Sequence, residues 1–136
     1  MGITQEDKNL LLKDLCARLP YGVKGHYKYY DIIGGSECLT DENDGDITSI
    51  DINLGNPIKI NGYYTEVDYV KPYLRPLSSM TDEEKDYMYR KFGWSYDDGY
   101  SWLQIEAWNY LYSIHIDVHG LIDKDLALEA PEGMYK

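Results

Sequence analysis

The chain has 136 residues, a net charge of −11 and 43% hydrophobic residues, and its apolar residues follow regular patterns. This combination predicts a single folded domain over residues 1–136 rather than a disordered chain. No basic cluster is longer than Arg90-Lys91, so the sequence excludes a direct nucleic-acid surface and an anionic-membrane surface as expected functions.

The N-terminus predicts a helix over residues 5–18. Thr4 stands where an N-cap is expected, and a stripe of apolar residues follows at helical spacing: Leu11, Leu12, Leu15, Cys16 and Leu19. Pro20 ends the helix, because the residue before a proline avoids helical geometry. We expect the stripe, including Cys16, to pack on a sheet. The second cysteine, Cys38, is expected in a strand, and both are interpreted as buried thiols.

Strands are predicted from residue 23 onward. The first covers residues 23–33 and is broken by Gly34-Gly35, a short one covers 37–40, and an acidic loop over 41–46 leads to alternating apolar residues through Leu54. Residues 58–60 and 63–70 then form a hairpin, with Asn61-Gly62 as the turn. Pro72 and Pro76 are expected to stop the strand pairing, because proline donates no backbone hydrogen bond.

The C-terminal part is predicted to be helical. Thr81 and Glu84 have the spacing of a capping box for a helix that continues to about Phe92. A loop over residues 93–99 precedes a second helix over 101–114, and a short helix or turn covers 122–128. The whole pattern indicates an α+β fold: an N-terminal helix, a small antiparallel sheet or partly open barrel of four or five strands, and C-terminal helices packed on it.

Tyrosine dominates the aromatic residues, with 15 Tyr and 3 Trp against 1 Phe. Tyrosine and tryptophan are enriched in protein interfaces, although a small protein also closes its core with such rings. We interpret the segment from Trp94 to Trp102 as a protein-contact surface, with Tyr96 and Tyr100 between them. Arg75 lies between Pro72 and Pro76 on a rigid extended segment. Its guanidinium is suited to pinning a C-terminal helix, or to binding an acidic partner, by a forked hydrogen bond.

One group of residues has the composition of a metal site. His115, Asp117 and His119 would share one face of an extended segment, and two imidazoles with a carboxylate suit iron or zinc. In a helix the same residues would diverge around the axis, and they would then be the polar residues of a helix end. Because no fourth ligand is evident, the prediction is a protein without a metal or cofactor.

Three phrases carry a resemblance: Leu15-Cys16-Ala17-Arg18-Leu19-Pro20-Tyr21-Gly22-Val23, Val70-Lys71-Pro72-Tyr73-Leu74-Arg75-Pro76-Leu77-Ser78-Ser79-Met80-Thr81, and Gly120-Leu121-Ile122-Asp123-Lys124 with Leu126-Ala127. Together they resemble a family of small uncharacterised proteins encoded by anaerobic gut bacteria, their phages and mobile elements. The resemblance implies an intracellular setting and a phage or mobile-element origin, and it supplies no activity. The family has Arg where this chain has His119, which weakens the metal interpretation.

The leading functional hypothesis is a non-enzymatic protein-binding module with an aromatic, acidic contact surface. A second hypothesis is an acidic mimic of nucleic acid that blocks a host protein, which requires a continuous stripe of carboxylates. A third is a metal-dependent enzyme that uses His115, Asp117 and His119. With no apolar segment long enough for a membrane span and no apolar core for a signal peptide, the expected location is cytoplasmic and no membrane partner is expected.

Overall fold

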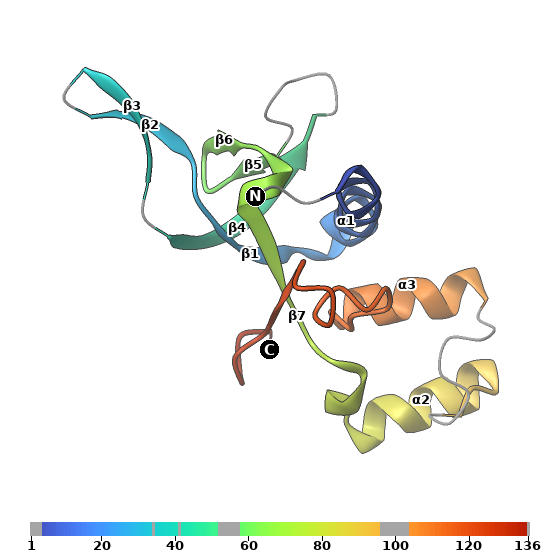
Figure 1. The fold of residues 1–136 in the computed structure, drawn as a ribbon. Helices are drawn as coiled ribbons and strands as arrows, with labels where there is room; N and C mark the ends of the chain where they lie inside the picture. Colours follow the sequence, from blue (N-terminus) through green and yellow to red (C-terminus); the bar gives the residue numbers. More distant parts are fainter. Residues whose placement is uncertain (1–3, 34, 41, 52–57, 96–103, 136) are drawn as a thin grey trace.

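The computed structural model describes residues 4–33, 35–40, 42–51, 58–95 and 104–135. The α+β class is confirmed (Figure 1): a helix α1 (Gln5–Arg18) at the N-terminus, an open mixed sheet of six strands, and the C-terminal helices α2 (Asp82–Phe92) and α3 (Ile105–Ser113). Within the described residues, no helix is both long and apolar enough to cross a membrane.

The main sheet has the strand order β6-β5-β4-β1-β7-β8. Its strands are β1 (Val23–Tyr27), β4 (Asn43–Ile50), β5 (Ile58–Ile60), β6 (Tyr63–Thr65), β7 (Val70–Leu74) and β8 (Leu128–Glu129). Neighbouring strands pair antiparallel except β7 and β8, which are parallel. Strands β2 (Tyr30–Ile33) and β3 (Ser36–Leu39) form a separate two-stranded ribbon that projects from the sheet (Figure 1). Three short 3₁₀ helices join these elements: η1 (Leu19–Tyr21), η2 (Val67–Tyr69) and η3 (Leu77–Ser79).

The strand boundaries differ from the prediction in two places. The predicted strand over 23–33 is two strands, because the chain leaves the main sheet at Lys28 and Tyr29 and enters the projecting ribbon. The acidic segment predicted as a loop belongs in part to β4, which begins at Asn43 and pairs with β1. Acidic residues are tolerated there because Asp44 and Asp46 of β4 are both exposed to solvent.

Pro72 lies inside β7, where the sequence predicted the end of strand pairing. The register pairs Pro72 with Gly25, and Lys28 N donates to Tyr69 O at 3.1 Å. In an antiparallel ladder, hydrogen-bonded and non-bonded pairs alternate, so Pro72 occupies a non-bonded position toward β1. On its other side, the described pairing with β8 begins only at Tyr73. A residue without an N–H therefore fits this strand at no cost in hydrogen bonds.

The hairpin turn at Asn61-Gly62 is confirmed, with φ values of 52° and 89°. The turn folds back over β4: Asn61 N donates to Asp46 O at 3.1 Å, and the Asn61 side chain lies directly above Gly45. An added Cβ at Gly45 would lie 2.8 Å from Asn61 Cβ. A glycine at position 45 therefore lets the Asn61-Gly62 turn pack closely against β4.

One face of the sheet forms the first core cluster with α1. Strand β1 alternates between buried and half-buried residues, with Val23 and Tyr27 facing the core. Leu11 and Leu15 supply the matching stripe of α1, whose N-terminus Thr4 caps by accepting from Asp7 N, so the predicted helix and cap are confirmed. Cys16 is exposed rather than buried, because it lies beside this stripe instead of within it, and both cysteines are free thiols.

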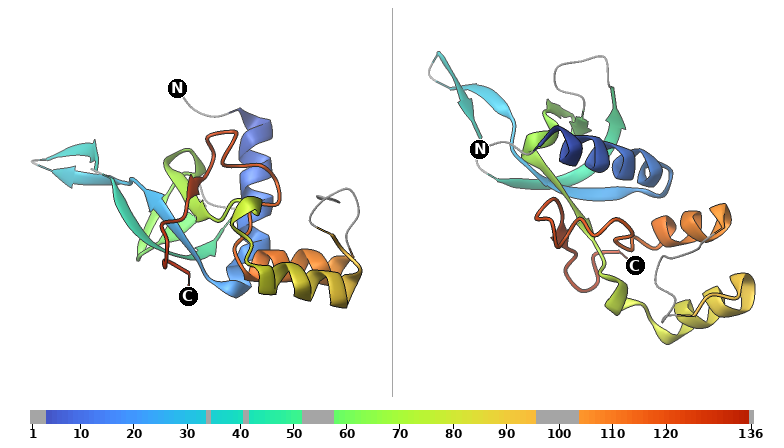
Figure 2. Two further views of the ribbon diagram at one scale, coloured as in Figure 1. Left: turned by 90° about the horizontal axis from the view of Figure 1, so that it is seen from below. Right: turned by 45° about the vertical axis from the view of Figure 1, so that its right-hand side comes forward.

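A second core cluster joins α2 and α3, which lie side by side (Figure 2). It contains these buried residues: Met80, Met88, Phe92, Trp94, Ala107, Leu111, Tyr112, Ile116 and Val118. The Thr81–Glu84 capping box of α2 is confirmed. α3 buries Ala107 and Leu111, whereas Ile105 at its start is 79% exposed.

Candidate functional site

The prediction that Trp94 belongs to a contact surface is wrong, because its side chain is buried. The Trp94 side chain is fully buried in the second core cluster, and the backbone N–H of Trp94 donates to Met88 O at 3.3 Å. A buried indole cannot contact a partner without unfolding its surroundings. The other predicted contact residues of this segment, Tyr96, Tyr100 and Trp102, lie outside the described residues.

Arg75 forms the forked contact that the sequence suggested. Its two terminal nitrogens donate to the Glu84 carboxylate at 2.8 and 2.7 Å, and the same group donates to the Ile114 carbonyl at 3.1 Å. Burial alone would raise the pKa of Glu84, but hydrogen bonds from Arg75 and Thr81 outweigh it and hold the pKa below its usual value. Arg75 therefore ties α2 to the end of α3, which is a positioning role within the chain.

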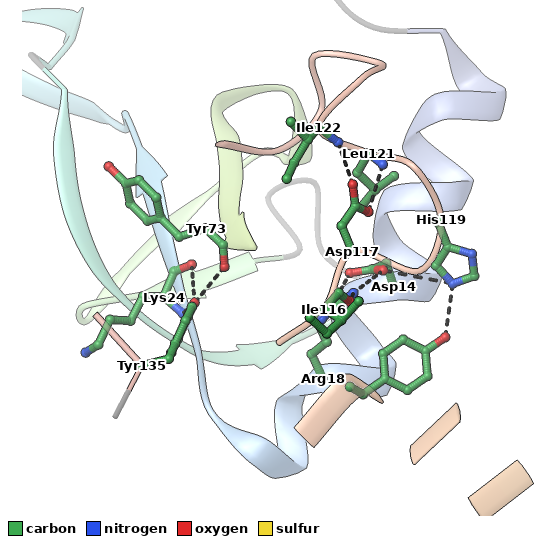
Figure 3. Close-up of polar contacts among 11 residues, drawn as sticks. Asp14, Arg18, Lys24, Tyr73, Ile116, Asp117, His119, Leu121, Ile122 and Tyr135 are labelled. Carbon is green, nitrogen blue, oxygen red and sulfur yellow. Dashed lines mark hydrogen bonds and ion pairs between the residues drawn. The ribbon is translucent and has the colours of Figure 1, made fainter. Parts of the chain in front are cut away.

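The predicted metal residues are engaged separately. The segment after α3 is a series of turns rather than an extended strand, and His115 itself has a φ of 69°. Asp117 accepts from the backbone N–H groups of Leu121 and Ile122 at 2.9 and 3.0 Å (Figure 3). Among the described residues, no group of three His, Cys, Asp or Glu side chains is arranged to hold a metal ion.

His119 belongs to a buried polar cluster between α1 and α3. Its Nε2 lies 3.0 Å from the Tyr112 hydroxyl and 3.9 Å from a carboxylate oxygen of Asp14. Asp14 in turn pairs with Arg18, whose guanidinium lies 5.1 Å from the centre of the Tyr112 ring. Burial lowers the pKa of His119, so the imidazole is neutral at neutral pH and suited to a hydrogen bond with a phenol.

Tyrosines gather instead around the start of the projecting ribbon and the edge strand β6, where Tyr30, Tyr63 and Tyr64 are exposed and Tyr29 and Tyr69 are half-buried. We call this group the tyrosine rim: Tyr29, Tyr30, Tyr63, Tyr64 and Tyr69. The rings of Tyr29 and Tyr63 stack at 4.0 Å with an interplanar angle of 16°. Lys59 Nζ lies 5.5 Å from the centre of the Tyr64 ring, so the face of this ring already accepts a cation.

Hydrogen bonds hold the tyrosine rim in place. Tyr29 N donates to Thr40 Oγ1 at 3.1 Å, and Thr40 N donates to Tyr29 O at 2.8 Å, which closes the base of the ribbon. The hydroxyls of Tyr30 and Tyr69 lie 3.1 Å apart. This hydrogen bond, burial and the nearby negative charges of Glu66 and Asp68 raise the pKa of Tyr69 to about 12. Its hydroxyl therefore stays protonated over the physiological range.

The solvent-facing side of the sheet carries a ladder of opposite charges. Residues of β1 and Lys28 just after it face acidic residues on the β4 side, in three pairs at 2.8, 2.9 and 3.9 Å: Lys24–Asp46, His26–Asp44 and Lys28–Glu42. The Tyr73 hydroxyl donates to Asp44 at 2.7 Å, and this bond with that of His26 lowers the pKa of Asp44. Asp44 and Asp46 of β4 are thus each paired with a residue of β1.

No family model, curated protein or solved structure matches this chain.

The sequence does not indicate the tyrosine rim, since its aromatic residues predict a contact surface after α2 instead. The available signal was the Tyr63-Tyr64 pair directly after the Asn61-Gly62 turn. Because a tight hairpin often supplies the last strand of a sheet, two adjacent tyrosines there indicate an edge with one ring on each face. The stacking of Tyr29 on Tyr63 joins residues from distant parts of the chain, and no local pattern predicts it.

Proposed function

We propose that this protein is a non-enzymatic protein-binding module whose contact surface is the tyrosine rim. The observation that carries the proposal is the exposure of Tyr30, Tyr63 and Tyr64, at 49%, 45% and 49%. A tyrosine ring offers a large contact area at a low cost in side-chain entropy. Before a partner binds, its hydroxyl can form hydrogen bonds with water.

The fixed positions of the rings in the tyrosine rim support this role. Tyr63 stacks on Tyr29, and Tyr30 is fixed by its hydroxyl contact with Tyr69, so these rings lose little freedom when a partner covers them. Binding costs less free energy when the contact side chains are already held in their bound arrangement. The two-stranded ribbon beside the rim adds a reason for a partner, since isolated two-stranded ribbons are of marginal stability in water.

The charge of the chain defines the partner. With a net charge of −11, and with Glu66 and Asp68 close to Tyr69, the rim favours a partner that presents Lys or Arg side chains. The Lys59–Tyr64 contact within the chain is an example of the cation–ring contact that such a partner would make. An acidic mimic of nucleic acid is less well supported, because the carboxylates of the charge ladder on β4 are already paired.

The proposal is tested by comparing two triple variants. In the first, Tyr30, Tyr63 and Tyr64 of the rim are replaced by Ala; in the matched control, the exposed residues Tyr87, Tyr89 and Ile105 are replaced instead. Each immobilised protein is incubated with a lysate of the native host, and captured proteins are quantified by mass spectrometry at two salt concentrations.

We expect the wild type and the control to capture the same basic protein, and the rim variant to lose about tenfold or more of it. Capture should weaken as salt rises, because part of the attraction is electrostatic. Circular dichroism confirms that each variant is folded. Equal capture by the folded rim variant and the control would show that the rim is not the contact surface.

A further inference from the structure

The C-terminal Tyr135 is inserted into the pairing between β1 and β7. The hydrogen bond from Lys28 N to Tyr69 O sets the alternation of this ladder, and continuing it would join Lys24 N to the carbonyl of Tyr73. Instead, the Tyr135 hydroxyl accepts from Lys24 N at 2.9 Å and donates to Tyr73 O at 2.8 Å (Figure 3). The phenol therefore replaces one rung of the sheet.

The ring of Tyr135 is held in place by a second contact. It stacks on the His115 ring, with the ring centres 3.6 Å apart and an interplanar angle of 13°. His115 has a φ of 69°, which requires a left-handed backbone at this residue and sets the imidazole in that position. Burial raises the pKa of the Tyr135 hydroxyl, so it keeps the proton that it donates to Tyr73.

The tail reaches this position by a short, ordered path. β8 pairs with the end of β7, and Ala130 N donates to Leu74 O at 2.7 Å. Met134 N then donates to Pro131 O at 3.1 Å, and Gly133 with a φ of 84° reverses the chain toward β1. After Ala130, the described contacts with the sheet are therefore made through Tyr135.

Two pockets of about 460 and 550 Å³ flank Tyr135. Both are lined by Arg75, Glu84 and Tyr135 itself. Lys24 and His115 also line the first, and Pro131 of the tail lines the second. Tyr135 thus lies at both pockets, while Lys24 of the split rung and the stacked His115 ring line the first.

We propose that removal of residues 131–136 opens the two pockets into one groove, that this groove is a docking site for a peptide that presents a tyrosine, and that the tail of the chain competes with that peptide. The split rung needs one group that both accepts from Lys24 N and donates to Tyr73 O, on a flat ring that stacks on His115. Tyrosine supplies both, whereas Phe has no polar atom and the indole of Trp only donates. The partner peptide enters when the tail leaves.

The test uses a chain that ends at Ala130, which retains β8 and its contact with Leu74. The probe is the fluorescein-labelled hexapeptide Pro-Glu-Gly-Met-Tyr-Lys, the sequence of residues 131–136, and fluorescence anisotropy measures its binding. We expect saturable binding to the shortened chain and about tenfold or weaker binding to the full chain, since the tethered tail has a high effective concentration. The same peptide with Phe in place of Tyr should bind about tenfold more weakly.

A third peptide, Gly-Ser-Gly-Ser-Tyr-Lys, distinguishes a site that binds other tyrosine-containing peptides from a site that binds only the chain's own residues 131–136. Binding of this peptide to the shortened chain supports the docking site. Binding of the native hexapeptide alone would overturn the proposal, because the groove would then recognise only its own tail. Equal binding of the Tyr and Phe hexapeptides would also overturn it, because the split rung would then play no part.

If the shortened chain does not fold, full-length variants provide the measurement. Tyr135→Phe retains the stack on His115 but removes the hydrogen bonds of the hydroxyl with Lys24 and Tyr73, so amide exchange at Lys24 should accelerate about tenfold or more. Tyr21→Phe, which alters another lining residue of the first pocket, should leave that exchange unchanged. Unchanged exchange at Lys24 in Tyr135→Phe would contradict the proposed role of the hydroxyl.

Discussion

Asp14 and Arg18 lie one turn apart in α1, and both side chains are 0% exposed. Arg18 Nη2 donates to Asp14 Oδ2 at 3.1 Å and to the Ile116 carbonyl at 2.6 Å. The pair therefore joins α1 to the segment that follows α3, at the boundary between the two core clusters. A buried pair of this kind adds less to stability than its short distances suggest, because both charges have lost their hydration.

Removing one member of this pair should be much worse than removing both. Arg18→Met leaves the Asp14 carboxylate buried without its charged partner, and we expect the free energy of unfolding to fall by about 3–5 kcal/mol. The double variant Asp14→Leu/Arg18→Met leaves no buried charge and should regain most of that loss. Urea unfolding at pH 7 measures both. A double variant no more stable than Arg18→Met would contradict this account.

The Arg75–Glu84 pair should depend on the shape of the guanidinium as well as on its charge. Arg75→Lys keeps the positive charge but loses the fork to Glu84, so we expect a loss of about 1–2 kcal/mol in urea unfolding. The matched control is Arg90→Lys, in the exposed pair with Asp86, where we expect no measurable change. Equal effects of the two substitutions would show that the fork adds nothing.

The same pair has a pH dependence with a defined sign. The pKa of Glu84 in the fold lies below its ordinary value of 4.5, so the folded chain favours the ionised carboxylate. Its contribution is present above about pH 4.5 and is lost as the pH falls through the lower, folded pKa. Glu84→Gln should therefore differ most from the wild type at neutral pH, and the difference should shrink on acidification.

Local signals in the sequence were sufficient for the elements that depend on neighbouring residues. Thr81 and Glu84 cap α2 as predicted, and Asn61-Gly62 makes the predicted turn. In both cases the residues that form the cap or the turn lie within a few positions of each other in the sequence. A short stretch of sequence is therefore enough to predict the structure.

Features that depend on distant partners were not predicted. Pro72 fits within β7 because of its register with Gly25, and register is set by pairing across the sheet. Trp94 is buried because α2 and α3 enclose it, although its acidic surroundings in the sequence suggested a loop on the surface. The position of Tyr135 requires His115, Lys24 and Tyr73 together. Such contacts arise only when the whole chain is folded.

His115 should make the protein less stable on mild acidification. Burial, with the positive charges of Arg18 and Arg75, lowers the pKa of His115 from 6.5 to about 4. Between these values the unfolded chain binds a proton that the folded chain does not, so the free energy of unfolding falls as the pH drops from 7 toward 4.

The expected loss from His115 is about 1–2 kcal/mol after allowance for the partly exposed ring. His115→Asn tolerates the same left-handed backbone and has no group that titrates in this range. Its stability should therefore vary less between pH 7 and pH 4.5 than that of the wild type, measured by urea unfolding at several pH values. Parallel pH profiles for the two proteins would assign the acid sensitivity to other groups.

Gly25 and Gly45 face each other across β1 and β4, and they provide a matched pair for the last prediction. A Cβ at Gly45 would lie 2.8 Å from Asn61 Cβ, which is attached to the backbone of the tight turn and cannot move away alone. A Cβ at Gly25 would meet the ends of the Ile47 and Ile60 side chains at 3.1 and 3.3 Å, and these can rotate.

We therefore expect Gly45→Ala to destabilise the protein by about 1–3 kcal/mol, and Gly25→Ala to cost less. Because the Asn61-Gly62 turn must shift to admit the new methyl group, Gly45→Ala should also accelerate amide exchange at Asn61, which donates to Asp46 O. Thermal unfolding and exchange measured on both variants check the two expectations. A larger loss for Gly25→Ala, with unchanged exchange at Asn61 in Gly45→Ala, would show that the turn does not rest on Gly45.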